Sequence, residues 1–212
     1  FMRRDMPDSA ISSLEEVIPK VDRKDQIYYQ IGRIYNSEQR YAKAVEYLEL
    51  AINEKPFETN YRLSLAETYD RAGQFDKAKE ILTNVIDEQP ENATAMNNLA
   101  YMYINRGERY DRAKEYLERA LEIDPDNGAF LDSYGWLLYK QGKPEEAVKY
   151  IQKAIEMIGE DPELYSHMGD VYRALEDYEK SAEFYRRAIE LEPDDPALKS
   201  KLDSLPAFGE ID

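Results

Sequence analysis

A period of about 34 residues is the feature of this sequence that most limits its fold. Small residues recur, in steps of 34 or 35, at Gly32, Ala66, Ala100, Gly135 and Gly169. A second small series keeps the same register at Ala44, Ala78, Ala113, Ala147 and Ser181. A turn residue closes each unit at Pro56, Pro90, Pro125, Gly159 and Pro193. Several series in one register indicate an array of repeated supersecondary units.

Each unit is predicted to form two helices. Between residues 128 and 161, the apolar residues Leu131, Tyr134 and Leu138 form a stripe at helical spacing. Gly142 then interrupts the helical pattern, and Pro144 suits the first position of a second helix. The recurring small residues mark the places where the paired helices cross, because a large side chain there would hold the backbones apart.

This pattern resembles the tetratricopeptide repeat, whose 34-residue unit carries a Leu-Gly pair, a later Tyr, then Ala, an aromatic residue and Pro. One match is the run Ile31-Gly32-Arg33-Ile34-Tyr35 with Ala44, Leu48 and Pro56. A second is Met168-Gly169-Asp170-Val171-Tyr172 with Ser181, Tyr185 and Pro193. The resemblance implies an all-α fold, a right-handed superhelical solenoid of helix-turn-helix repeats.

The register divides the chain into repeats and ends. The repeats are expected at 25–58, 59–92, 93–127, 128–161 and 162–195. The repeat at 93–127 carries one inserted residue, in the turn Gly107-Glu108-Arg109-Tyr110. Residues 1–24 are expected to hold the second helix of a truncated repeat, so the chain is interpreted as a fragment of a longer array.

The C-terminal end departs from the repeat pattern. Residues 196–205 are expected to form a capping helix, with Leu198, Leu202 and Leu205 on one side and Lys201 among the outward residues. Residues 206–212 are expected to be a tail.

Composition limits the classes of function. The formal net charge of −16 repels phosphate backbones and argues against nucleic acid as a partner. The chain has no cysteine and one histidine, so no metal site is expected. No glycine-rich phosphate loop is present, and no cofactor is expected. His167 could reach Ser133 or Ser166, but no elbow motif or oxyanion-hole pattern accompanies it. The chain is therefore predicted not to be an enzyme.

The candidate site follows from the resemblance. In tetratricopeptide proteins the first helix of each repeat lines a concave wall that binds extended or helical peptides. The positions expected on this wall are Asn97, Asn98, Tyr101, Asn105, Asp132, Trp136, Tyr139, Lys140, His167, Asp170 and Arg173. Aromatic residues there would supply contact area, and asparagines could pair with a peptide backbone.

Each of these residues has a competing structural interpretation. Trp136 follows Gly135, so helix geometry turns it about 100° away from the helix crossing. It could face the groove, or it could pack between adjacent first helices as core. The same two possibilities hold for Tyr101 and Tyr139, and the asparagines could instead form hydrogen bonds between repeats.

A narrower similarity covers residues 97–170. It rests on Asn97-Asn98-Leu99-Ala100-Tyr101, the inserted turn, the run from Asp124 to Trp136, and His167-Met168-Gly169-Asp170. These segments are similar to bacterial repeat proteins, in particular to outer-membrane-anchored lipoproteins that act as adaptors for envelope proteases. The similarity implies a periplasmic location, with a lipid anchor in the full-length protein, and an envelope protease or its substrate as partner.

The sequence thus predicts a protein-interaction module that binds a basic or neutral protein or peptide segment in its concave groove. No apolar run is long enough to span a bilayer, so no direct membrane insertion by this segment is expected. Two alternatives stay open: a scaffold that self-associates through its tyrosine-rich faces or its ends, and the substrate-recruiting arm of a larger enzyme.

Overall fold

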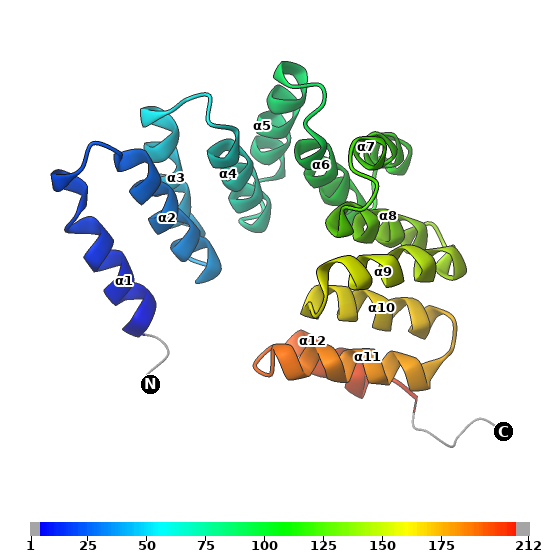
Figure 1. Ribbon diagram of the computed structural model, residues 1–212. Coiled ribbons are helices and arrows are strands. Elements are labelled where there is room, and N and C mark those ends of the chain that lie inside the picture. Colours follow the sequence, from blue (N-terminus) through cyan, green and yellow to red (C-terminus); the bar gives the residue numbers. More distant parts are fainter. Residues whose placement is uncertain (1–4, 207–212) are drawn as a thin grey trace. The chain divides into compact units, whose positions relative to one another are not determined.

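The computed structural model describes residues 5–206; residues 1–4 and 207–212 lie outside the described part, and so does the predicted tail beyond Pro206. Within 5–206 every regular element is a helix, which confirms the all-α prediction (Figure 1). The elements are α1 (Asp5–Glu15), η1 (Ile18–Lys20), α2 (Lys24–Ser37), α3 (Tyr41–Glu54), α4 (Thr59–Arg71), α5 (Phe75–Glu88), α6 (Ala93–Arg106), α7 (Tyr110–Ile123), α8 (Gly128–Lys140), α9 (Pro144–Ile158), α10 (Pro162–Ala174), α11 (Tyr178–Leu191) and α12 (Pro196–Asp203).

Helix crossings are set by the small residues of the repeat. A Cβ atom placed on Gly135 would lie 2.6 Å from Ile151 Cγ1, and one on Gly169 would lie 2.4 Å from Tyr185 Cε1. Ala147 and Ala154 on α9 are fully buried. At Gly135 and Gly169 the paired helices therefore approach so closely that even a methyl group would collide with the facing side chain.

The turns inside the hairpins use left-handed backbone. Gly73 (φ 74°) and Gly142 (φ 77°) occupy the turn position, and Gln39 (φ 57°) and Glu176 (φ 59°) take it without being glycine. The repeat with the inserted residue has two left-handed residues, Gly107 (φ 70°) and Arg109 (φ 53°). The insertion is thus absorbed in the turn, and α6 and α7 keep the same length of 14 residues.

The chain divides into two compact units, residues 1–98 and 99–212, and the division falls within α6. In the first unit, α2 pairs with α3 and α4 with α5 (Figure 1). Ile11 of α1 packs with Ile31 and Ala44, where a preceding second helix would pack. The buried Asp25 carboxylate links α2 to α4, because Tyr61 donates a hydrogen bond of 2.7 Å to it.

In the second unit, α8 pairs with α9 and α10 with α11, and α12 packs beside α11 (Figure 1). Leu198 of α12 is buried against Tyr165 and Ala188. The capping helix ends at Asp203, two residues before the predicted end. Among residues 5–206, no helix has the length and apolar character needed to cross a membrane.

Candidate interaction groove

An open depression of about 730 Å³ lies in the second unit, on residues of α8, α10 and α12 and the turns that precede the last two. Five carboxylates line it, namely Asp161, Glu163, Asp170, Glu192 and Asp195, against the two lysines Lys140 and Lys201. Trp136, Tyr139 and His167 supply its aromatic part. Five of the residues expected on the groove wall are therefore brought together here: Trp136, Tyr139, Lys140, His167 and Asp170.

Trp136 packs between neighbouring first helices and leaves 7 % of its surface exposed. Its indole stacks on the His167 ring of α10, with centroids 4.0 Å apart, and on Tyr139, with centroids 4.9 Å apart. Its Nε1 donates a hydrogen bond of 2.9 Å to Asn105 Oδ1 on α6. Trp136 thus forms the floor of the depression, and most of its surface packs between adjacent first helices as core.

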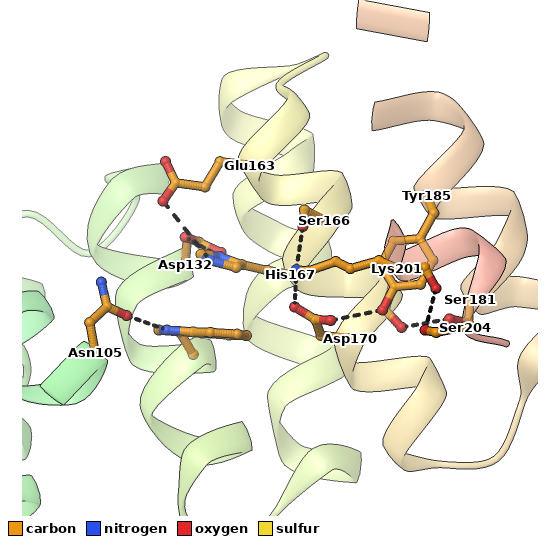
Figure 2. A network of polar contacts seen from close by, with 12 residues as sticks. Asn105, Asp132, Glu163, Ser166, His167, Asp170, Ser181, Tyr185, Lys201 and Ser204 are labelled. Carbon is orange, nitrogen blue, oxygen red and sulfur yellow. Dashed lines mark hydrogen bonds and ion pairs between the residues drawn. The ribbon is translucent and has the colours of Figure 1, made fainter. Parts of the chain in front are cut away.

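His167 is buried, with 5 % of its surface exposed, beside the Asp132 carboxylate of α8 (Figure 2). Its Nδ1 lies 3.0 Å and 2.9 Å from the two Asp132 oxygens, and its Nε2 lies 4.0 Å from Glu163 Oε1. Burial lowers the pKa of His167. The charges of Asp132, Glu163 and Asp170 and the hydrogen bond to Asp132 raise it by more than burial lowers it, so the pKa lies above its ordinary 6.5. The imidazole is therefore held by a carboxylate on α8, and the contact links α10 to α8.

A second carboxylate network joins α10 to α12 (Figure 2). Lys201 Nζ donates to Asp170 Oδ2 at 2.5 Å and to Ser166 Oγ at 2.8 Å. The Tyr185 hydroxyl of α11 donates to Asp170 Oδ1 at 2.7 Å. Burial and the Asp170 charge raise the pKa of Tyr185, so the hydroxyl keeps its proton for this bond. Lys201 was expected to point outward; instead it faces the depression, because it pairs with these oxygens.

Glu163 extends over the same wall from the first turn of α10. Its carboxylate accepts a hydrogen bond from the Tyr101 hydroxyl of α6, while 63 % of its side chain stays exposed. Burial and the nearby Glu163 charge raise the pKa of Tyr101. Tyr101 is half-buried by these contacts and is therefore both a packing residue and part of the wall.

These polar contacts repeat along the chain at a spacing of 35 residues. Tyr29 contacts Ser64 at 3.2 Å in the first unit; His167 contacts Asp132 and Lys201 contacts Ser166 in the second. Each contact joins the first helix of one repeat to the next first helix along the chain. Lys201 lies one period after His167, a signal that would have placed it on the wall from the sequence.

The remaining expected residues lie elsewhere. Asn97 and Asn98 belong to the first unit, where Asn97 is buried and its Nδ2 lies 3.5 Å from Asn98 Oδ1. Arg173 is exposed near the end of α10. Asn105 is exposed and holds Trp136. Glu163, Lys201 and Tyr185 were not among the expected residues. Within the described residues, no group of three or more histidine, cysteine or acidic side chains could hold a metal ion.

The sequence matches models of a known protein family. Three models described as tetratricopeptide repeat match residues 25–58, residues 162–195, and the overlapping segments 71–130 and 108–166. The chain is a tetratricopeptide repeat protein. Tetratricopeptide repeats generally mediate protein–protein interaction, and proteins of this fold are typically non-enzymatic interaction modules that bind proteins or peptides.

Relatives of this tetratricopeptide repeat protein include a TPR repeat-containing protein of Pseudomonas aeruginosa, 30 % identical over 148 residues. That match covers 68 % of this chain and 24 % of the relative. Photosystem I assembly protein Ycf3 of Cyanophora paradoxa is 30 % identical over 95 residues, 43 % of this chain and 55 % of Ycf3. The chain thus spans only about a quarter to a half of these relatives.

Solved structures share the fold. A thermophilic TPR protein of Thermus thermophilus matches with a TM-score of 0.73 and 21 % identity, over 85 % of this chain and 98 % of that one. A chain of the APC/C hetero-tetramer Cut9-Hcn1 matches with a TM-score of 0.83 and 14 % identity, over 97 % of this chain and 41 % of that one.

Proposed function

We propose that this protein is a non-enzymatic adaptor that binds a basic segment of another protein in the depression formed by α8, α10 and α12. The observation that carries the proposal is the charge of the lining, five carboxylates against two lysines. Both lysines are already engaged: Lys201 with Asp170, and Lys140 with its ammonium 4.5 Å from the Trp136 ring centroid. The half-exposed Tyr139 and the exposed Glu163 then offer an aromatic face and an accessible carboxylate to a cationic side chain.

A peptide array tests this proposal. The full chain is incubated with an array of random-sequence peptides, and bound peptides are remeasured by calorimetry. We expect the selected sequences to be rich in lysine and arginine. The double variant Glu163→Gln/Glu192→Gln should weaken their binding at least several-fold, because it removes two exposed lining charges.

The matched control, Glu122→Gln/Glu190→Gln, changes the net charge equally but acts on exposed positions of the second helices α7 and α11. It should leave binding nearly unchanged. Selected peptides without excess positive charge, or equal losses in the two double variants, would refute the groove as the binding site.

Self-association is the second candidate, and one observation favours it. Ile123, Met157 and Leu191 are spaced 34 residues apart near the ends of α7, α9 and α11, and are 48 %, 49 % and 39 % exposed. Such an apolar series could pair with a second copy of the chain. Light scattering at several concentrations separates the two: a defined oligomer that Met157→Glu dissociates would favour the scaffold, and a monomer would favour the adaptor.

The wider context of the protein is also a proposal. The similarity to envelope adaptors suggests a periplasmic location and an envelope protease or its substrate as the partner. One relative carries the name of an assembly protein, which agrees with an adaptor role. Because the chain matches only 24 % of its Pseudomonas relative, the same groove could equally serve as the recruiting arm of a larger protein.

A further inference from the structure

The wall of the depression contains one imidazole, that of His167, whose positive charge is present below its pKa and lost above it. His167 and Lys201 occupy the same place in consecutive first helices and make the same contact, 35 residues back, to Asp132 and Ser166 respectively. Lysine at this place carries a permanent charge, whereas histidine titrates between pH 5 and 8. The two successive contacts therefore differ in their response to pH.

The charged groups around His167 come from every helix packed against it. Asp132 lies on α8, Glu163 and Asp170 on its own helix α10, and the Tyr101 hydroxyl reaches Glu163 from α6. Lys201 of α12 neutralises Asp170, and the Lys140 ammonium of α8 lies 4.5 Å from the Trp136 ring centroid. Three carboxylates thus favour a proton on the imidazole, and one of them, Asp170, is paired with Lys201.

The same carboxylates face the depression. His167, Glu163 and Asp170 all line it, and Figure 2 shows His167 and Glu163 on the side of Asp132 of α8 and Asp170 directed toward Lys201 of α12. A cationic side chain that enters the depression approaches Glu163 and the Asp170–Lys201 pair, and the charges of these two carboxylates also stabilise the imidazolium. A protonated His167 changes the local charge by one positive unit at the place where such a side chain would lie.

We propose that a proton on His167 and a basic segment in the depression compete for the same carboxylates, so that affinity for the segment rises as His167 loses its proton. This inference rests on the proposed function and states how that site is regulated. The imidazolium and the entering cationic side chain repel each other. For two unit charges about 7 Å apart and an effective dielectric constant of roughly 40–80, Coulomb's law predicts an affinity about three- to eightfold weaker when His167 is protonated. Linkage requires that the bound segment lower the pKa of His167 correspondingly, by about half to one pH unit.

The chain is well suited to test this competition, because it has one histidine and one tryptophan, and their rings are stacked. NMR of the only imidazole gives the pKa of His167 without ambiguity. Trp136 emission reports the same event, because a charged imidazolium quenches a stacked indole more strongly than a neutral imidazole. The probe is an acetylated, amidated octapeptide of alternating lysine and alanine, added to the full chain at low ionic strength; the glutamate–alanine octapeptide is the control.

We expect the lysine peptide to bind three- to eightfold more tightly above the pKa of His167, which the NMR titration locates, than at pH 5.5, and to lower that pKa, while the glutamate peptide does neither. In His167→Gln the affinity should be independent of pH over this range. An unchanged pKa of His167 at saturating lysine peptide, or a pH dependence that persists in His167→Gln, would overturn the competition. The NMR titration of the wild-type chain decides the question even if His167→Gln is poorly folded.

Failure of this inference and failure of the proposed function give different results. If array-selected basic peptides bind and Glu163→Gln/Glu192→Gln weakens them, but affinity is equal at both pH values, the groove stands and the competition is wrong. If basic peptides do not bind at either pH, the proposed function itself is wrong.

Discussion

Gly169 sets the spacing of the hairpin that carries the C-terminal part of the groove. A Cβ atom there would lie 2.4 Å and 2.5 Å from two ring carbons of Tyr185, a ring whose hydroxyl is held by Asp170. We expect Gly169→Ala to destabilise the protein by about 1–3 kcal/mol through overpacking, despite the better helix propensity of alanine. Urea denaturation measures this cost. An unchanged or higher midpoint would show that the α10–α11 contact is looser than described.

The pair His167–Asp132 makes stability depend on pH. The folded pKa of His167 is raised above its ordinary 6.5, so the stabilisation is fully present below about pH 6.5 and is lost as pH rises through the folded pKa. We expect the difference in Tm between wild type and His167→Gln to be largest near pH 5.5 and to shrink as the pH rises through the folded pKa. A difference that grows with pH would mean that His167 is neutral in the folded protein.

Trp136 and Tyr139 both line the depression, but replacing them by alanine should destabilise the protein by different amounts. Trp136→Ala should destabilise by about 3–5 kcal/mol, because it removes a buried, stacked indole and its bond to Asn105. Tyr139→Ala, at a half-exposed position, should cost about 1 kcal/mol. Thermal unfolding of the two variants checks this order. Equal losses of stability would place the indole on the surface. Because Trp136→Ala is expected to destabilise the fold, a binding test should change Tyr139 or Glu163 in place of Trp136.

Residue-level detail was the least predictable part of the site. Helix geometry turned Trp136 away from the crossing at Gly135, but it could not show that His167 from the next first helix covers the indole. The pairing of His167 with Asp132 depends on two helices that lie 35 residues apart. The leucines of residues 196–205 predict an outward Lys201, whereas its position one period after His167 predicts the place on the wall that the structure shows.

At the scale of single helices, caps hold the wall of the groove. Asp161 accepts hydrogen bonds from the backbone N–H of Glu163 (2.9 Å) and Leu164 (3.0 Å) at the start of α10. We expect Asp161→Ala to cost about 1 kcal/mol of stability. The neighbouring Glu160→Ala, at an exposed position before the cap, should change it by less than about 0.5 kcal/mol. Chemical denaturation of both variants tests the cap, and equal effects would rule it out.

The helices themselves followed closely from the sequence. Small residues at the crossings, glycine in the turns and proline at the start of α9, α10 and α12 have direct steric reasons, so the pattern predicted them. The turn before Tyr110, where the repeat pattern has one residue more, carries Gly107 and Arg109 in the left-handed region. The division into two units within α6 had no signal in the sequence, because it depends on contacts between helices and leaves the period unchanged.

At the scale of the whole molecule, the charge of −16 is the property that most directly bears on partners. The charge is spread over the chain, but in the second unit five carboxylates gather around one depression. Composition alone argues against nucleic acid and favours a basic partner. It could not locate the site, because exposed charges on helical repeats look alike in sequence until the fold brings some of them together.

The most direct test of the account is to map where a basic peptide contacts the folded chain. The lysine–alanine octapeptide is titrated into the isotope-labelled protein, and shifts of the backbone amide signals are recorded by NMR. We predict that the largest shifts fall on α8, α10 and α12, around Tyr139, Glu163 and Lys201, and saturate together. Shifts concentrated on the second helices α7, α9 and α11, or no saturable shifts at all, would contradict the groove in the second unit as the binding site.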